Sequence, residues 1–130
     1  NYCKLLNIEA MTMLDMATMD IIPSVIKYKG DVAKAANESL ALGVEADEEK
    51  DICNDLATHL KEATACVKAL KDALQKAHSL GENVNGGRCY HDDVLVAMAN
   101  LRKVVDEMEL LTAKEYWPVP SYGDLLFSVH

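Results

Sequence analysis

Aromatic residues are scarce in this 130-residue sequence: they make up 5% of it, although half of all residues are hydrophobic. The apolar positions are filled mostly by Ala, Leu, Val and Met, and runs of β-branched residues are few. Strands favour β-branched and aromatic side chains, whereas Ala, Leu and Met are strong helix formers. The composition therefore argues against a sheet and predicts an all-α domain.

Long hydrophobic runs and an excess of basic residues are also absent. No apolar stretch approaches the roughly 18 residues that a membrane-spanning helix needs, and no signal peptide is visible. The net charge is −8 and the pI is near 4.9. Nucleic acid and anionic membrane surfaces are negatively charged and would repel such a chain. We therefore expect neither nucleic acid nor a membrane as a partner.

The cysteines give no sign of a disulfide framework. They are well separated, and none forms a C-x-x-C pair: Cys3, Cys53, Cys66 and Cys89. Long amphipathic helices can build a core without cross-links, so we interpret the cysteines as buried or half-buried thiols in a reducing compartment. We expect the protein to be cytoplasmic.

The length fits one domain, residues 1–130. The chain begins with Asn1 rather than Met and enters an apolar-periodic segment without a convincing helix cap. We interpret it as a fragment of a larger chain.

The first predicted helix spans about residues 2–42 and ends at Gly43, a typical C-terminal cap. Pro23 lies inside it and predicts a kink, because proline lacks an N–H donor and its ring clashes with the preceding turn. The apolar stripe changes side at the proline, which a bend or two different packing partners would produce. Before the proline it contains Tyr2, Leu6, Met13 and Ala17, with Leu5 and Met16 beside them, and after it Ile21, Val25, Tyr28, Val32 and Ala36.

Two acidic residues, Glu9 and Asp20, fall near the middle of the first half of this stripe. Either they are buried or edge carboxylates paired with Lys or Arg, or they contact a part of a parent protein outside this chain. Four of the six methionines cluster in the same half: Met11, Met13, Met16 and Met19. Methionine fills cores but also forms adaptable docking surfaces, so both uses stay open here.

The second predicted helix spans about residues 47–80, with Asp47 as a candidate N-cap and Gly81 after its end. Its apolar residues are spaced three and four apart, as in the seam of a helical bundle. They are Ile52, Leu56, Leu60, Ala63, Val67, Leu70, Leu74 and Ala77.

The stretch from Gly81 to Tyr90 contains three glycines and two asparagines and predicts a loop. The third predicted helix follows over about residues 92–115, capped by Asp92 or Asp93. Its stripe contains Val94, Met98, Leu101, Val105, Met108 and Leu111.

Three such helices joined by short turns predict an antiparallel bundle, whose third helix is too short to cover the other two. The tail, residues 116–130, holds the sole Trp, the sole Phe and two of the three prolines. Its prolines favour an extended chain, so the helix must end near Tyr116. We expect this aromatic tail to pack back on the bundle or to dock on a neighbouring domain or subunit.

Residue patterns for catalysis or metal binding are weak. The Glu-x-x-His motif of di-iron bundles is absent. His59, with Asp55 and Glu62 on the same helix, is a candidate metal edge, but such a histidine is usually solvated. Cys89 and His91 lack an evident third member for nucleophilic catalysis.

Both ends of the sequence resemble the C-terminal part of type III glutamine synthetases, the large bacterial class. The tail AKEYWPVPSYGDLLFSV and the preceding VLVAMANLRKVVDEMELL are similar to the C-terminus of that class. LNIEAMTMLDMATMDIIPSVIKY, residues 5–28, resembles the helix that follows its catalytic domain. The middle resembles the family more weakly.

The resemblance implies a parent enzyme that ligates ammonia to glutamate with ATP and Mg²⁺ or Mn²⁺ and assembles into a dodecamer. The family's catalytic and metal-binding residues lie upstream, and none maps onto this chain. We therefore expect no catalytic residue, cofactor or metal here, and inactivity of the fragment alone. The expected role is packing against the catalytic domain and neighbouring subunits. The candidate contact residues are Glu9, Met13, Met16, Asp20, Tyr116, Trp117, Tyr122, Leu126 and Phe127.

Two other functions stay open. The chain could be a free-standing helical regulator that binds a protein partner through its Met-rich face. It could also be a metal-binding bundle, a hypothesis that rests on His59 and its acidic neighbours alone.

Overall fold

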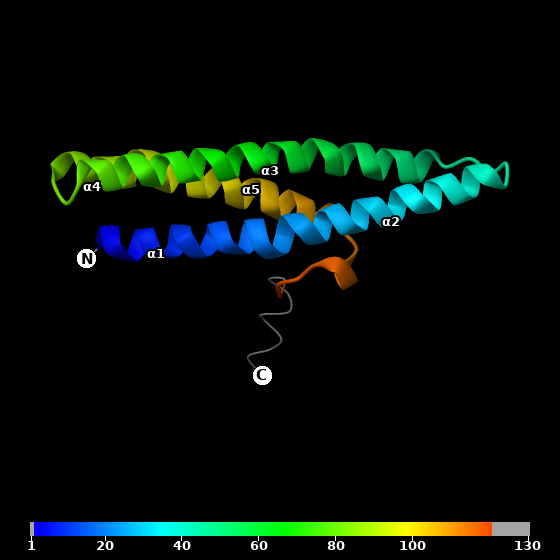
Figure 1. The fold of residues 1–130 in the computed structure, drawn as a ribbon, viewed down its shortest axis with the longest axis horizontal. Helices are drawn as coiled ribbons and strands as arrows, with labels where there is room; N and C mark the ends of the chain where they lie inside the picture. Colours follow the sequence, from blue (N-terminus) through cyan, green and yellow to red (C-terminus); the bar gives the residue numbers. More distant parts are fainter. Residues whose placement is uncertain (1, 121–130) are drawn as a thin grey trace.

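The computed structural model describes residues 2–120, and every regular element in that range is helical, which confirms the all-α prediction. The longer helical elements follow one another in three rods, residues 2–41, 47–80 and 84–111. Figure 1 shows these rods side by side, with the chain reversing direction between one rod and the next. Residues 121–130 lie outside the described residues, and with them the predicted contacts of Tyr122, Leu126 and Phe127.

The first rod consists of α1 (Tyr2–Asp15), the π-helical segment η1 (Met16–Ile21) and α2 (Ile22–Ala41). The irregularity predicted at Pro23 is this π-helical turn, which ends just before the proline. In it the Ile22 N–H donates to the carbonyl of Ala17, five residues back rather than four. Proline interrupts the normal ladder because it offers no N–H, and a wider turn accommodates its ring. The ribbon changes direction at this point (Figure 1).

The second rod is α3 (Asp47–Leu80), with the predicted bounds. Gly43, after the first rod, and Gly81, after α3, both have positive φ, the conformation that ends helices and suits glycine. The prediction that Asp47 caps α3 was wrong: Ala46 holds the cap position, and no side chain bonds there. Asp47, Glu48 and Glu49 lie instead in the first turn, where the helix dipole favours negative charge.

The third rod begins earlier than predicted. The segment predicted as a loop contains α4 (Val84–Cys89), which continues through the π-helical η2 (Tyr90–Val94) into α5 (Leu95–Leu111). The N-cap is Asn83, whose side-chain oxygen accepts from the Gly86 N–H at 2.9 Å, rather than Asp92 or Asp93. The prediction was wrong because glycines weaken helices without forbidding them, and tertiary contacts outweigh that cost here.

The rod also ends earlier than predicted, at Leu111 rather than Glu115, because Thr112 adopts an extended backbone. A short 3₁₀ helix, η3 (Lys114–Tyr116), follows, and Trp117 is extended before Pro118, as expected for a residue preceding proline.

One hydrophobic core joins the three rods, and α3 contacts both of the others. The predicted seam of α3 is buried from Leu56 to Ala77, with Ile52 half-buried, and that of α5 is buried at Val94, Met98, Leu101 and Met108. In the first rod the prediction was partly wrong. Its buried residues are Leu6, Ala10, Leu14, Ala17, Ile21, Val25 and Ala36.

The discrepancy in the first rod has a simple cause. Tyr2, Leu5 and Met16 were placed on the core side, but all three are exposed, and Met13 is half-buried. Because α1 carries apolar residues on both its inner and its outer side, periodicity alone could not tell which side faces the bundle.

Candidate functional site: an apolar face and groove on α1

A groove runs between the first rod and α5 and is bordered by the segment after η3. Its volume is about 480 Å³. The first rod contributes residues from Ile8 to Ile21, α5 contributes residues from Arg102 to Glu109, and Trp117, Val119 and Pro120 close one side. The floor is largely apolar, with Ile8, Met13, Met16, Ile21 and Val105.

Four of the predicted contact residues line this groove: Glu9, Met13, Met16 and Trp117. Asp20 does not line it, and Tyr116 lines a separate small cleft with Ser24, Lys27, Asp31 and Glu115. The structure thus brings together residues from both ends of the described chain. Whether they contact a partner remains a prediction.

Sequence reasoning missed the wall of the groove that α5 supplies. Arg102, Val105, Asp106 and Glu109 lie along one side of that helix, at spacings of three and one residues. Such spacing places them on one helical face. Val105 belongs to the predicted apolar stripe, but the three charged residues are of the kind usually found on a solvent-exposed face, so the sequence pattern gave no sign of a groove wall.

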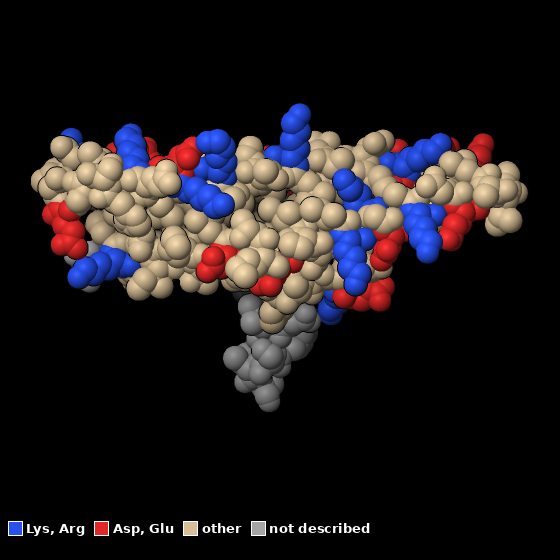
Figure 2. Space-filling model, in the orientation of Figure 1, with Lys and Arg blue, Asp and Glu red and all other residues tan. Residues whose placement is uncertain are grey.

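Continuous with the groove, α1 and η1 present an exposed apolar stripe, which we call the outer stripe: Leu5, Ile8, Met16 and Met19, of which Ile8 and Met16 also line the groove. Met19 is 72% exposed and Ile8 61% exposed. The spacings of three, eight and three residues place these side chains on the side of the helix opposite Leu6, Ala10 and Leu14. Figure 2 shows mostly uncharged surface along α1, whereas Lys, Asp and Glu gather toward the far end of α2.

The first interpretation of Glu9 and Asp20, a buried or edge carboxylate paired with Lys or Arg, does not agree with the structure, in which both side chains are exposed. Neither takes part in an ion pair between residues of the described range. An exposed carboxylate keeps its hydration and needs no Lys or Arg partner. The second interpretation, contact with a part of a parent protein, stays open for both residues.

Tyr116 fastens the segment after α5 to α2. Its hydroxyl donates to Asp31 Oδ2 at 2.6 Å, and its ring lies 5.0 Å from the ring of Tyr28 between centroids. The hydrogen bond to the Asp31 carboxylate raises the pKa of Tyr116, because the carboxylate stabilises the protonated hydroxyl. This contact positions Trp117 and Val119, which pack partly buried against the core.

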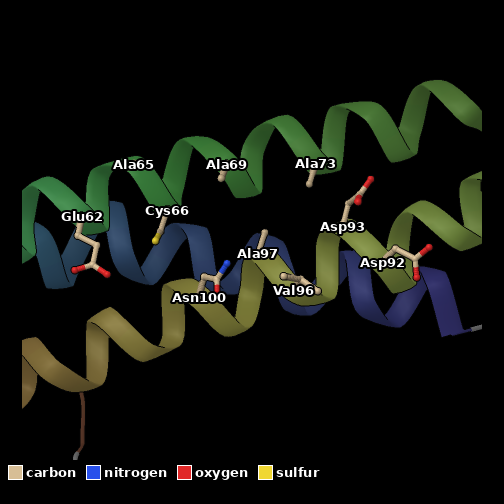
Figure 3. A pocket seen from close by; sticks show the side chains of 10 residues that line it. All are labelled: Glu62, Ala65, Cys66, Ala69, Ala73, Asp92, Asp93, Val96, Ala97 and Asn100. Carbon is tan, nitrogen blue, oxygen red and sulfur yellow. The ribbon is translucent and has the colours of Figure 1, made fainter.

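A second hollow lies between α3 and α5 (Figure 3). Small side chains of Ala65, Cys66, Ala69 and Ala73 from α3 face Val96 and Ala97, with carboxylates at its two ends. Burial, and to a smaller extent Glu62, raises the pKa of the Cys66 thiol, which makes it a poor nucleophile.

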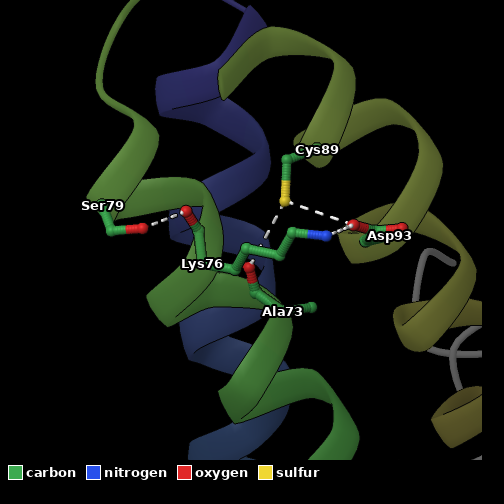
Figure 4. Close-up of polar contacts among 5 residues, drawn as sticks. All are labelled: Ala73, Lys76, Ser79, Cys89 and Asp93. Carbon is green, nitrogen blue, oxygen red and sulfur yellow. Dashed lines mark hydrogen bonds and ion pairs between the residues drawn. The ribbon is translucent and has the colours of Figure 1, made fainter. Parts of the chain in front are cut away.

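Cys89 is buried where α3 meets the third rod (Figure 4). Its thiol lies 3.8 Å from the Ala73 carbonyl and 3.4 Å from Asp93 Oδ2, and Lys76 donates to the same oxygen at 3.2 Å. Burial and the nearby carboxylate raise the pKa of the Cys89 thiol. A thiol that resists ionisation is a poor nucleophile, which argues against the Cys89–His91 hypothesis.

His59 on α3 contacts Glu107 on α5, and both of its ring nitrogens are engaged in hydrogen bonds. Its Nδ1 lies 2.7 Å from the Asp55 carbonyl oxygen, and its Nε2 lies 3.0 Å from Glu107 Oε2. With both ring nitrogens in hydrogen bonds, this geometry disfavours the metal-edge hypothesis. Within residues 2–120 no group of three or more His, Cys, Asp or Glu side chains could hold a metal ion.

All four cysteines are free thiols. The Cys53 thiol on α3 donates a hydrogen bond to the Lys29 carbonyl on α2 at 3.6 Å.

None of the helices in the described range is both long enough and apolar enough to cross a membrane.

Comparison with known proteins places these features in a family context. A model of the glutamine synthetase C-terminal domain matches residues 1–39, which contain α1, η1 and most of α2. A glutamine synthetase from Butyrivibrio fibrisolvens is 30% identical over 131 residues, covering 99% of this chain and 19% of the relative.

Two further relatives match nearly the whole chain. A type-3 glutamine synthetase from Dictyostelium discoideum is 25% identical, with 97% of this chain and 18% of the relative covered. A glutamine synthetase from Bacteroides fragilis is 21% identical, with 98% of this chain and 18% of the relative covered. No solved structure matches. The chain spans less than a fifth of these relatives, and the predicted resemblance is confirmed: this is a chain similar to the C-terminal helical domain of type III glutamine synthetases.

Proposed function

We propose that this chain is a non-catalytic structural and assembly domain of a type III glutamine synthetase. The observation that carries the proposal is the outer stripe, because it makes α1 apolar on two opposite sides. A large exposed apolar patch on a soluble protein usually marks an interaction surface, and the three-rod bundle buries only the inner side of α1. The exposed side therefore calls for a second partner.

The partner that we propose is the rest of the parent enzyme, namely its catalytic domain or a neighbouring subunit of a dodecamer. Two facts support this choice. The relatives are more than five times longer than the matched segment, so most of such a parent lies outside this chain. The segment matched by the family model, residues 1–39, is also the one that carries the outer stripe.

In this proposal the reaction takes place elsewhere in the parent. Ligation of ammonia to glutamate, with its ATP and Mg²⁺ or Mn²⁺, is assigned to the upstream part, and the whole enzyme would be cytoplasmic. A free-standing regulator is the less favoured alternative, since all three relatives carry the matched segment within a much longer chain. An open reading frame without an upstream ATP-binding domain would favour that alternative.

The test uses the parent enzyme and places a charge within the outer stripe. Leu5→Asp combined with Met19→Asp should dissociate the oligomer or detach the domain, because two carboxylates would have to be desolvated at an apolar contact. The matched control is Gln75→Asp with Asn54→Asp, which adds the same two carboxylates at exposed positions of α3. Sedimentation velocity and limited proteolysis provide the measurement. An unchanged oligomer and unchanged protease resistance in the stripe variant would exclude the proposal.

A further inference from the structure

The turn that joins α2 to α3 carries another exposed apolar surface, which we call the hairpin tip: Leu40, Leu42 and Val44. Leu42 is 82% exposed and Val44 56% exposed. The hairpin tip shares no residue with the outer stripe or with the groove. We propose that it binds a separate partner protein, through an apolar pocket on that protein that is rimmed by Lys and Arg. The inference does not rest on the proposed assembly function.

The hairpin tip stands beyond the end of the third rod. Glu107 on α5 lies 3.0 Å from His59 on α3, and α5 ends four residues later, at Leu111. Because the chain runs in opposite directions along the two helices, α5 ends near Asp55, and residues 47–54 of α3 extend past it by about 12 Å. Figure 1 shows α2 and α3 continuing to their joining turn without the third rod beside them. Within the described part of the chain, the bundle therefore leaves this turn open to a partner.

The backbone of the hairpin tip is fixed by hydrogen bonds. At the end of α2 the Gly43 N–H donates to the Leu40 carbonyl, and the Val44 N–H donates to the Ser39 carbonyl, both at 3.0 Å. This pair of bonds forms a Schellman motif, in which Gly43 takes the positive φ. The residue after the glycine usually packs against an apolar side chain of the helix, but that position here is Ser39, and Val44 stays exposed. A turn that is already ordered loses little conformational entropy when a partner binds it.

Acidic residues surround the hairpin tip. Between residues 38 and 51 the one basic residue is Lys50, and the acidic residues are Glu38, Glu45, Asp47, Glu48, Glu49 and Asp51. The dipole of α3 favours the three in its first turn. It does not account for Glu45 in the turn, and Glu38 lies at the end of α2, where the helix dipole favours cations instead. A basic rim on the partner would complement these carboxylates, whereas the tip of a second copy would be repelled.

The charge also indicates how the partner binds. Complementary charges around a contact mainly accelerate association. This acceleration benefits a protein that arrives by diffusion, binds and leaves, and a permanently attached domain has no use for it. The outer stripe, along which Figure 2 shows mostly uncharged surface, fits a permanent contact better. We therefore assign the hairpin tip to an exchangeable partner rather than to the parent enzyme.

The experiment places the photoreactive amino acid benzoylphenylalanine at residue 42 of the parent enzyme, expressed in its own host and irradiated in fresh lysate. The matched control carries the same group at Leu110, a leucine of α5 that is 87% exposed. Mass spectrometry identifies the crosslinked peptides. We expect residue 42, but not residue 110, to crosslink to one separate protein, at apolar residues that have Lys or Arg nearby.

Capture of a protein does not by itself support the proposal, so a second arm tests the charge. Glu38→Lys with Glu45→Lys should lower the crosslinking yield at residue 42 about tenfold, because electrostatic steering raises association rates by about 10-fold or more. The control, Asp72→Lys with Glu82→Lys, makes the same change of charge at exposed positions away from the tip and should leave the yield unchanged. Added salt should lower the yield of the unmodified tip, because it screens exposed charges.

Three results would overturn the proposal. The first is equal crosslinking at residues 42 and 110. The second is a crosslink to another part of the parent enzyme or to a second copy of it. The third is a yield that survives the reversal of charge at Glu38 and Glu45. None of these readouts is the oligomeric state of the parent, so this test fails or succeeds independently of the assembly proposal.

Discussion

At the scale of single residues, the sharpest constraint lies at Gly86. A Cβ atom at this position would collide with the carbonyl oxygen of Gly81 and lie 3.1 Å from its carbonyl carbon. Both contacts are with backbone, which cannot swing away as a flexible side chain can. The neighbouring Gly87 has no atom within 4 Å of its own Cβ position. Two adjacent glycines in α4 thus have opposite roles.

We therefore predict that Gly86→Ala destabilises the chain by about 1–3 kcal/mol, the usual cost of forcing extra atoms into a packed site. Gly87→Ala should stabilise it by about 0.5–1 kcal/mol, because alanine loses less conformational freedom in a helix. Urea unfolding of the two variants measures both effects. A Gly86→Ala variant as stable as the unmodified chain would show that the α3–α4 turn can open without cost.

At the scale of elements, α3 is connected to α5 by a pH-sensitive contact. The hydrogen bond with the Asp55 carbonyl raises the pKa of His59 most, partial burial opposes this, and Glu107 and Glu62 raise it further. Since the pKa is higher in the folded chain than in the unfolded one, protonation of His59 favours folding. The contribution is fully present below the ordinary pKa of 6.5 and is lost as the pH rises through the higher folded value.

We expect Glu107→Gln to lower the pKa of His59 and to reduce stability by about 0.2–1 kcal/mol below about pH 6, as is typical of ion pairs accessible to solvent. Above about pH 8.5, where histidine is neutral, the two proteins should differ much less. NMR titration of the histidine rings and urea unfolding at both pH values provide the measurement. His91→Gln is the control, because His91 is exposed and, among the described residues, its side chain hydrogen-bonds only with its neighbour Asp92. A loss of stability that is equal at both pH values would contradict the assignment.

Both π-helical segments, η1 and η2, lie within rods that the sequence pattern describes as regular or nearly so. Pro23 predicts the first, because a missing N–H donor must disturb the ladder nearby. Nothing comparable marks the second: Tyr90–Val94 contains no proline, and Tyr90 and Val94 are both buried. The α4, η2 and α5 segments all pack against α3, and these tertiary contacts have no counterpart in the local sequence.

At the scale of the whole molecule, one core shared by three rods should unfold as a unit. Leu101 is fully buried on α5, whereas Leu110 on the same helix is 87% exposed. We predict that Leu101→Ala costs about 2–5 kcal/mol and Leu110→Ala less than about 0.5 kcal/mol. Circular dichroism and Trp117 fluorescence should report the same urea midpoint for each variant. Separate midpoints would show that the rods unfold independently.

The sequence by itself determined the helical class, the bounds of α3 and the seams of α3 and α5. These features follow from local helix propensity and from the single apolar side of each helix, which the spacing of the apolar residues shows directly. The glycines that end the first rod and α3 were equally visible, because a positive φ is costly for other residues.

The tertiary structure alone decided which side of α1 faces the core, because that helix is apolar on both sides and its own sequence is ambiguous. It also decided that the glycine-rich segment is helical, because α4 packs against α3, a contact that the local sequence does not show. The groove required tertiary structure as well: its walls come from residues more than eighty positions apart, and no local sequence pattern shows that they meet.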